Sequence, residues 1–203
     1  MPHQQLVNVG ESFTFDRLVV TGDEAIQLTG DATYWRDIDF PIIVRTKAAG
    51  IPTLATLNGN ITMPQWEVND ENTCESQEFV HEWKEDSAVY LHIHLTTNGS
   101  NVDNRYVRFT VEYGYVSPGG AWVFPSVMDS GDILIAANTP TKSMRIISIG
   151  SFTPANTSIG GHAVAILKRI ASTGTAPSAN PWVSMLQMHI ECDALGSRSI
   201  SDK

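Results

Sequence analysis

The 203-residue sequence predicts an all-β fold, an antiparallel β-sandwich or jelly roll with an N-terminal arm. Three observations support this prediction. Several segments alternate between apolar and polar residues with a period of two, which is typical of strands that bury one face. Clusters of Gly, Pro, Asn, Asp and Ser separate these segments, as turns do. No segment has convincing helical periodicity, and the Gly pair and β-branched residues around Ala163–Ile170 favour a strand there.

The clearest alternation lies in Val89–Leu95, where Val, Leu, Ile and Leu alternate with Tyr, His and His. A turn with the pair Asn98-Gly99 follows, and Asn-Gly is favoured in hairpin turns. Arg105–Val116 then alternates again, so we expect these two segments to pair as one long hairpin. The other strand candidates are Phe13–Val20, Phe40–Arg45, Phe79–Trp83, Met144–Gly150, His162–Ile170 and Trp182–Cys192.

The last candidate strand indicates which of its residues share a face. Its alternation places Trp182 and Leu186 on the apolar face and His189 on the polar face. The chain is long enough for one domain of ordinary size. Residues 1–30 carry a weaker strand pattern than the rest, so we expect an arm there that docks on the body or on a neighbour. Residues 31–203 then form the sandwich domain.

The charge of the chain limits the classes of partner that it can bind, and its cysteine content limits disulfide formation. It carries 13 Lys and Arg against 22 Asp and Glu, a formal charge of −9, whereas a duplex nucleic-acid binder has a basic face. No apolar run approaches the length of a membrane span, and residues 1–5 lack the features of a signal peptide. We therefore expect neither nucleic acid nor membrane as a partner. Cys74 and Cys192 are too few for a disulfide framework, and we expect two separate thiols.

The most specific constellation is His92-x-His94. Two imidazoles two residues apart on a strand point to the same side and could reach one metal ion, as in cupin-like enzymes. His189 and Glu191 repeat this arrangement and could meet the first pair across neighbouring strands. A cupin would need a carboxylate shortly after the second His, where residues 96–98 are Thr, Thr and Asn. The alternatives are a satisfied hydrogen-bond network or a face between subunits.

Five tryptophans have two alternative roles, in a large core or subunit interface, or in a platform on which sugars stack. We take Trp35, Trp122 and Trp182 as candidates for contact with another subunit or a glycan. Arg198 lies in a short polar tail and is the candidate anchor of that segment.

Four motifs, taken together over residues 34–203, resemble a family of tailed-bacteriophage virion structural proteins. The sequence departs from the family where Leu95, Glu191 and Cys192 replace frequent aromatic residues. The motifs are Trp35–Pro41, Lys84–Asp86 before His92–His94, Val111–Tyr113 before Gly119–Trp122, and His189–Arg198.

This resemblance implies a non-enzymatic structural subunit of a phage particle with a jelly-roll-like body and trimeric association. It implies no catalytic residues and no cofactor. The partners would be copies of the chain and other proteins of the tail or capsid, and the location would be the virion, assembled in the host cytoplasm. A compact sandwich with an arm favours a tail- or fibre-associated attachment module that could contact host-surface glycan. The alternatives are a capsid decoration or head-fibre protein and a cupin-like metal-binding enzyme.

Overall fold

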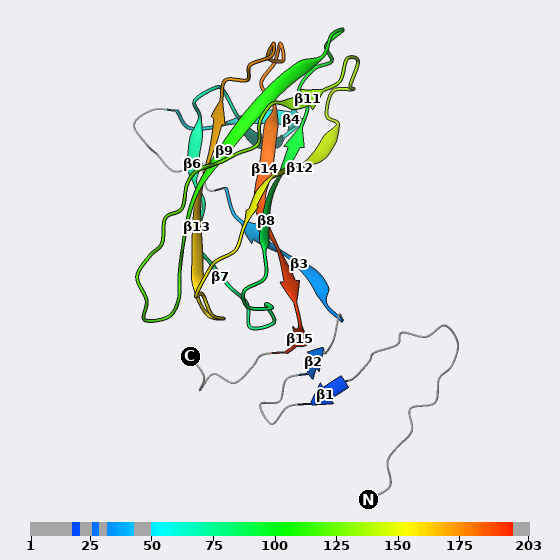
Figure 1. Cartoon of the computed structure of the whole chain (residues 1–203). Helices are drawn as coiled ribbons and strands as arrows, with labels where there is room; N and C mark the ends of the chain where they lie inside the picture. Colours follow the sequence, from blue (N-terminus) through cyan, green and yellow to red (C-terminus); the bar gives the residue numbers. More distant parts are fainter. Residues whose placement is uncertain (1–17, 21–25, 29–31, 43–49, 197–203) are drawn as a thin grey trace, which may run out of the picture.

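The computed structural model describes residues 18–20, 26–28, 32–42 and 50–196. It confirms the all-β sandwich-like fold, with two large antiparallel sheets, one of them curled, and a small third sheet (Figure 1). None of the described residues belongs to a helix that could cross a membrane.

One large sheet, called here the β8 sheet, has the strand order β12-β8-β14-β5-β4, and β3 also pairs with β14. Its strands are β12 (Met144–Phe152), β8 (Val89–Thr96), β14 (Trp182–Cys192), β5 (Ile61–Gln65), β4 (Thr53–Asn58) and β3 (Tyr34–Phe40).

The other large sheet, called the β9 sheet, has the order β10-β9-β13-β6, with β11 pairing to β9 and β7 to β13. Its strands are β10 (Met128–Asp129), β9 (Arg105–Val116), β13 (His162–Ile170), β6 (Glu71–Thr73), β11 (Ile133–Ile135) and β7 (Gln77–Glu78).

The core lies between the two large sheets because each contributes one apolar face. Leu91 and Ile93 of β8 meet Val107 and Phe109 of β9 in one cluster, and all four are almost completely buried. Burial of such faces is the main favourable contribution to folding. The alternation in the sequence predicted β9, β13 and β14 with their observed ends, and β8 and β12 to within two residues.

The predicted hairpin between β8 and β9 is wrong. β8 lies between β12 and β14, whereas β9 belongs to the other sheet, so the connecting segment crosses from one layer to the next. That segment is held by the loop before β12: the Thr97 hydroxyl donates to the carbonyl of Pro140 (2.7 Å), and the Gly99 amide donates to the Thr141 hydroxyl (3.0 Å). Alternation did not distinguish the two arrangements, because strands that face each other across a core show the same pattern as paired strands.

Of two further strand predictions, the first is tested only in part and the second is wrong. The expected strand Phe40–Arg45 begins where β3 ends, and residues 43–45 lie outside the described residues. Phe79–Trp83 is a turn, in which the Trp83 amide donates to the carbonyl of Val80 (2.9 Å). Phe79 and Trp83 are both fully buried and pack with ring centroids 4.7 Å apart. Their apolar spacing therefore reflects a turn that points both rings inward.

The described part of the expected arm belongs to the small third sheet. β1 (Leu18–Val20) pairs with β2 (Ile26–Leu28), and β2 pairs with β15 (Ala194–Leu195) near the other end of the chain. The amide of Leu28 also donates to the carbonyl of Asp193 (2.7 Å). Residues 13–17 of the candidate strand Phe13–Val20 lie outside the described residues.

The two cysteines are separate, as predicted. Cys74 and Cys192 are both free and buried. Burial raises the pKa of the Cys74 thiol to about 12, so this thiol is protonated at neutral pH.

Candidate interaction surfaces

The polar side chains of β8 lie on the outer face of its sheet, away from the core. Strand register places Gln187 and His189 of β14 opposite His92 and Tyr90 of β8. The same two residues of β14 pair on their other side with Asp39 and Asp37 of β3. We call this surface the imidazole face. It comprises Trp35, Asp37, Asp39, Tyr90, His92, His94, Gln187 and His189.

Hydrogen bonds connect the imidazole face across its three strands. His189 Nδ1 and Asp37 Oδ1 are 2.6 Å apart, and His92 Nε2 lies 2.7 Å from Gln187 Oε1. Because that amide oxygen only accepts, His92 Nε2 is the donor in this pair. Gln187 Nε2 in turn donates to Asp39 Oδ1 (2.6 Å). His92 and His189 therefore have partners within the chain, whereas the buried Nε2 atom of His94 has no hydrogen-bond partner among the described residues.

Aromatic contacts cover the same face. The ring of His189 stacks on Trp35 with centroids 4.8 Å apart and an interplanar angle of 5°, and Tyr90 meets Trp35 edge to face at 5.7 Å. Trp35 is 49% exposed and Tyr90 is 42% exposed. The result is a half-exposed aromatic patch beside the Asp37 carboxylate, an arrangement that can contact a protein or a sugar ring.

The geometry of the imidazole face differs from that of a cupin-like metal site. The ring centroids of His92 lie 5.5 Å from His94 and 6.0 Å from His189, and Glu191 bonds to Lys84 (3.0 Å) instead of joining them. Within the part of the chain that the structure describes, no three His, Cys, Asp or Glu side chains are placed to hold a metal ion. The imidazoles also lie outside the sandwich, whereas the cupin-like reaction needs them in a barrel interior.

The candidate contact residues outside the imidazole face are Trp122, Trp182 and Arg198, and they differ in their place in the structure. Trp122 is half exposed and stacks on Phe124 with centroids 6.1 Å apart. Trp182 is only 3% exposed, so the expectation that it contacts a partner or glycan is wrong for this chain. A register shift between Val183 and Leu186 changes the alternation there, and Val183 joins the main core cluster. Arg198 lies outside the described residues.

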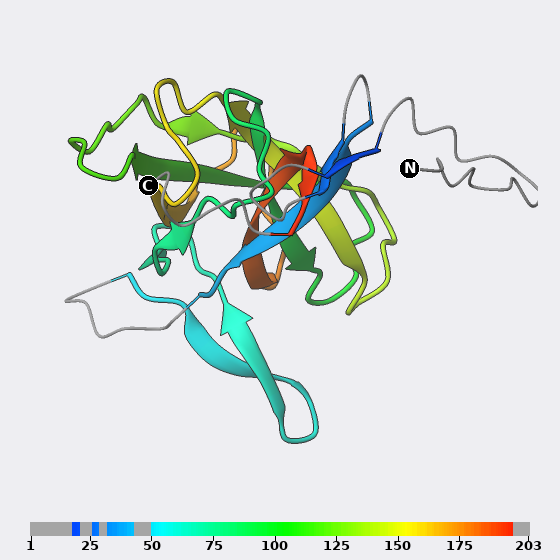
Figure 2. The same ribbon diagram turned by 90° about the horizontal axis from the view of Figure 1, so that it is seen from below.

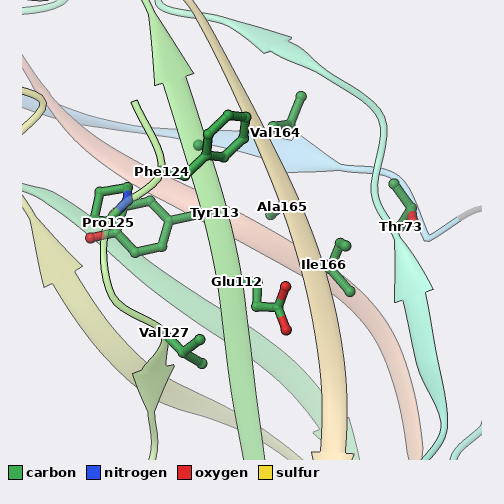
Figure 3. Close-up of a pocket in the computed structure, with 10 residues that line it drawn as sticks. Thr73, Glu112, Tyr113, Phe124, Pro125, Val127, Val164, Ala165 and Ile166 are labelled. Carbon is green, nitrogen blue, oxygen red and sulfur yellow. The ribbon is translucent and has the colours of Figure 1, made fainter. Parts of the chain in front are cut away.

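A second surface is an apolar groove on the outer face of the β9 sheet, with a volume of about 390 Å³ (Figure 3). The segment 117–127 borders it and is held to β9 by two backbone hydrogen bonds between Tyr115 and Val123 (3.0 and 2.9 Å). The Phe124 ring lies over Gly114, where a Cβ would come within 2.6 Å of it. The groove is lined by Thr73, Glu112, Tyr113, Gly114, Phe124, Pro125, Val127, Val164, Ala165 and Ile166.

Sequence reasoning missed this groove, because its wall and floor come from distant segments. The apolar run 121–125 after the Gly-Gly turn is the one local signal that could have indicated it.

The third surface is the β4–β5 hairpin, which extends away from the two-sheet body (Figure 2). No residue of either strand is fully buried. Leu54 is 62% exposed and Ile61 is 61% exposed. Lys142 Nζ donates to Asn58 Oδ1 near the end of the hairpin (3.2 Å). The hairpin thus presents apolar side chains to solvent on an extended element.

Comparison with known proteins gives distant structural similarity only. No family model matches the chain, and no curated protein matches it. Solved structures of infectious bursal disease virus are similar to 93% of the chain, with TM-scores of 0.39 for the Gx strain and 0.37 for the Gt strain. The sequence identities are 10% and 9%, and the match covers 37% and 36% of the viral chains, so this chain spans little more than a third of their length.

Proposed function

We propose that the chain is a non-enzymatic structural subunit of a virus particle, and specifically a trimeric tail- or fibre-associated module of a bacteriophage. The observation that carries this proposal is the set of exposed apolar side chains on the groove, the hairpin and the imidazole face. Large contiguous apolar surface on a soluble domain marks interaction sites. A subunit with several such surfaces is suited to bind copies of itself and other virion proteins.

The arrangement of the phage-like motifs supports the same proposal. The motif Trp35–Pro41 coincides with most of β3, His92–His94 lies in β8, and the last motif begins in β14. These three strands are neighbours and build the imidazole face. The salt bridge from Lys84 to Glu191 (3.0 Å) adds a fourth motif segment to the same region. Residues that are far apart in the sequence thus contribute to one surface, as a contact region of a folded subunit would require.

Solution mass of the purified full chain tests the subunit role. Sedimentation velocity and native mass spectrometry should show a discrete oligomer with the mass of a trimer at micromolar concentration. A chain that remains monomeric at about 100 µM would contradict self-association.

A map of the intact particle tests the location in the virion. Density for this sandwich on the tail or its fibres is the expected result. Density on the capsid shell would instead support the alternative of a capsid decoration or head-fibre protein.

Glycan contact is a second candidate role, which the half-exposed Trp35 and the Asp39 and Gln187 side chains further along the same face favour. Aromatic faces with adjacent amide and carboxylate groups can stack on sugar rings and accept their hydroxyl hydrogen bonds. A glycan array probed with the full chain and with Trp35→Ala should show binding that the variant loses. Equal signals for both chains would remove this role from the imidazole face.

A further inference from the structure

We propose that the β4–β5 hairpin of one copy docks in the apolar groove on the β9 sheet of a neighbouring copy. This inference rests on the proposed function as a self-associating subunit, and it names the two surfaces that meet. Each copy would donate one hairpin and receive another.

The hairpin has the features of an element that gains stability from a partner. A two-stranded hairpin is marginally stable in water without further packing. β5 continues the β8 sheet through one registered pair, Trp182 with Gln65, and among the described residues β4 pairs only with β5. Leu54 and Ile61 are each about three-fifths exposed. A partner that covers them would remove apolar area from water.

The edge of β4 that has no partner strand among the described residues also lacks the usual protection. Edge strands commonly carry Lys, Pro or inward-pointing charges that prevent pairing with other chains. Thr53–Asn58 has none of these residues, and no charged residue occurs anywhere between Lys47 and Glu67.

Charge favours a second copy as the occupant of the groove. Each copy has a formal charge of −9, so two copies repel each other least when they meet through uncharged surfaces. The hairpin is uncharged, and Glu112 is the one charged residue in the lining of the groove. A basic partner or nucleic acid would instead select an acidic or basic surface, which neither element provides.

The groove is suited in size and chemistry to receive individual side chains of the hairpin. Its volume of about 390 Å³ lies within the range of about 300–1,000 Å³ that is typical of binding pockets. Phe124 and Val127 border it on one side, and Val164 and Ile166 of β13 form its floor (Figure 3). These apolar side chains can receive a branched aliphatic residue such as Ile61.

The placement of the two surfaces determines the symmetry of the assembly. The hairpin belongs to the β8 sheet and the groove to the outer face of the β9 sheet, so the contact joins different surfaces of the two copies. Such heterologous contacts form closed rings or open filaments, and a three-membered ring is a trimer. Direct pairing of two β4 edges would instead give a two-fold dimer.

The test uses the full chain and one charged substitution on each surface. Ile61→Asp alters the hairpin, Phe124→Asp and Val127→Asp alter the groove, and Val102→Asp is the matched control because Val102 is 78% exposed outside both surfaces. Far-UV circular dichroism and thermal unfolding select the variants that fold. Sedimentation velocity should then show about 100-fold weaker association for hairpin and groove variants and unchanged association for the control.

Mixing the variants gives the decisive measurement. An Ile61→Asp copy keeps an intact groove and a Val127→Asp copy keeps an intact hairpin, so the mixture should form one-to-one dimers that neither variant forms alone. Groove variants that assemble like the wild type, or a mixture that stays monomeric, would overturn the inference while the subunit role stands. A monomeric wild-type chain would contradict the proposed function itself.

Discussion

The outer faces of the two large sheets differ in how their side chains find partners. On the β8 sheet, Asp37, Gln187 and the imidazoles of His92 and His189 bond to one another within the chain. On the β9 sheet, the groove beside Phe124 is apolar and has no such network. The first face is mostly polar, and His92 and His189 have partners within the chain there although the buried His94 Nε2 has none among the described residues. The second face presents apolar surface that only another molecule can cover.

Under the proposed self-association, this difference indicates which surface would depend most on a partner. Internal hydrogen bonds lower the gain that a polar face obtains from a new partner, because bonds within the chain must be exchanged. Apolar surface has no such competing interaction, and its burial is favourable in proportion to area. We therefore expect the groove and the hairpin to provide affinity, and the imidazole face to provide a specific contact of smaller energy.

The largest expected loss of stability comes from a substitution in the core between the two large sheets. Phe109 is fully buried on the inner face of β9 and meets Trp66 edge to face, with centroids 6.1 Å apart. Phe109→Ala should lower the free energy of unfolding by about 3–5 kcal/mol, because it leaves a cavity in close-packed surroundings. Urea unfolding followed by tryptophan fluorescence and far-UV circular dichroism measures this loss. Val102→Ala is the exposed control, and a loss below about 1 kcal/mol for Phe109→Ala would show that the sheets do not share this core.

A smaller loss of stability is expected from a substitution of Gly114, the residue of β9 on which the Phe124 ring of the groove wall rests. A Cβ at this position would lie 2.6 Å from two ring carbons of Phe124, so Gly114→Ala must displace that ring. The loss in unfolding free energy should be about 1 kcal/mol, the low end for overpacked sites, because the Phe124 ring is 71% exposed and can move toward solvent. In a Phe124→Ala background the same substitution should cost much less, since the clashing ring is absent. Equal costs in both backgrounds would show that Phe124 does not rest on Gly114.

Strands with one buried face were predictable from the sequence, and strands exposed on both faces were not. In β8 and β13 every second side chain is buried, which produces the alternation that identified them. No residue of β4 is buried, so its sequence has no such contrast between faces. In β3 only Ile38 and Phe40 are buried, and the exposed Trp35 interrupts the pattern.

The candidate surfaces were predictable only as far as they depend on one strand. Alternation correctly grouped His92 with His94, because both belong to β8. The pairing of Asp37 with His189 depends on the register between segments that are 152 residues apart, which no local pattern records. A register shift in β14 placed Val183 in the core cluster, and alternation alone cannot locate such an irregularity.

The imidazole face itself should be less sensitive to substitution than the groove. Asp37→Ala removes the acceptor for His189 Nδ1, at a partly exposed pair whose contribution should be about 1 kcal/mol or less. Asp37→Asn keeps a side-chain oxygen and should retain part of this stability. Thermal unfolding at pH 7 compares both variants with the wild type. A loss above about 3 kcal/mol for Asp37→Ala would show that the network is a main support of the β8 sheet.

The smallest expected effect is a change in how the free energy of unfolding depends on pH. It distinguishes the polar face, which carries titrating groups, from the apolar one. The hydrogen bond from Lys84 lowers the pKa of Glu191 below its ordinary value. A lowered pKa in the folded state stabilises the fold above the ordinary pKa of a glutamate, and this contribution is lost as the pH falls through the lowered pKa. Glu191→Gln should therefore be less stable than the wild type at pH 7, by under about 1 kcal/mol because the pair is partly exposed. The two chains should converge in acid once Glu191 is protonated in the wild type.

Urea unfolding of both chains from pH 7 down to acid measures this convergence, with Asp103→Asn as the control on a mostly exposed carboxylate. Substitutions in the uncharged hairpin, such as Ile61→Ala, should change stability by the same amount at every pH, because they remove no titrating group. If Glu191→Gln also gave a pH-independent difference, the Lys84 pair would contribute nothing through charge.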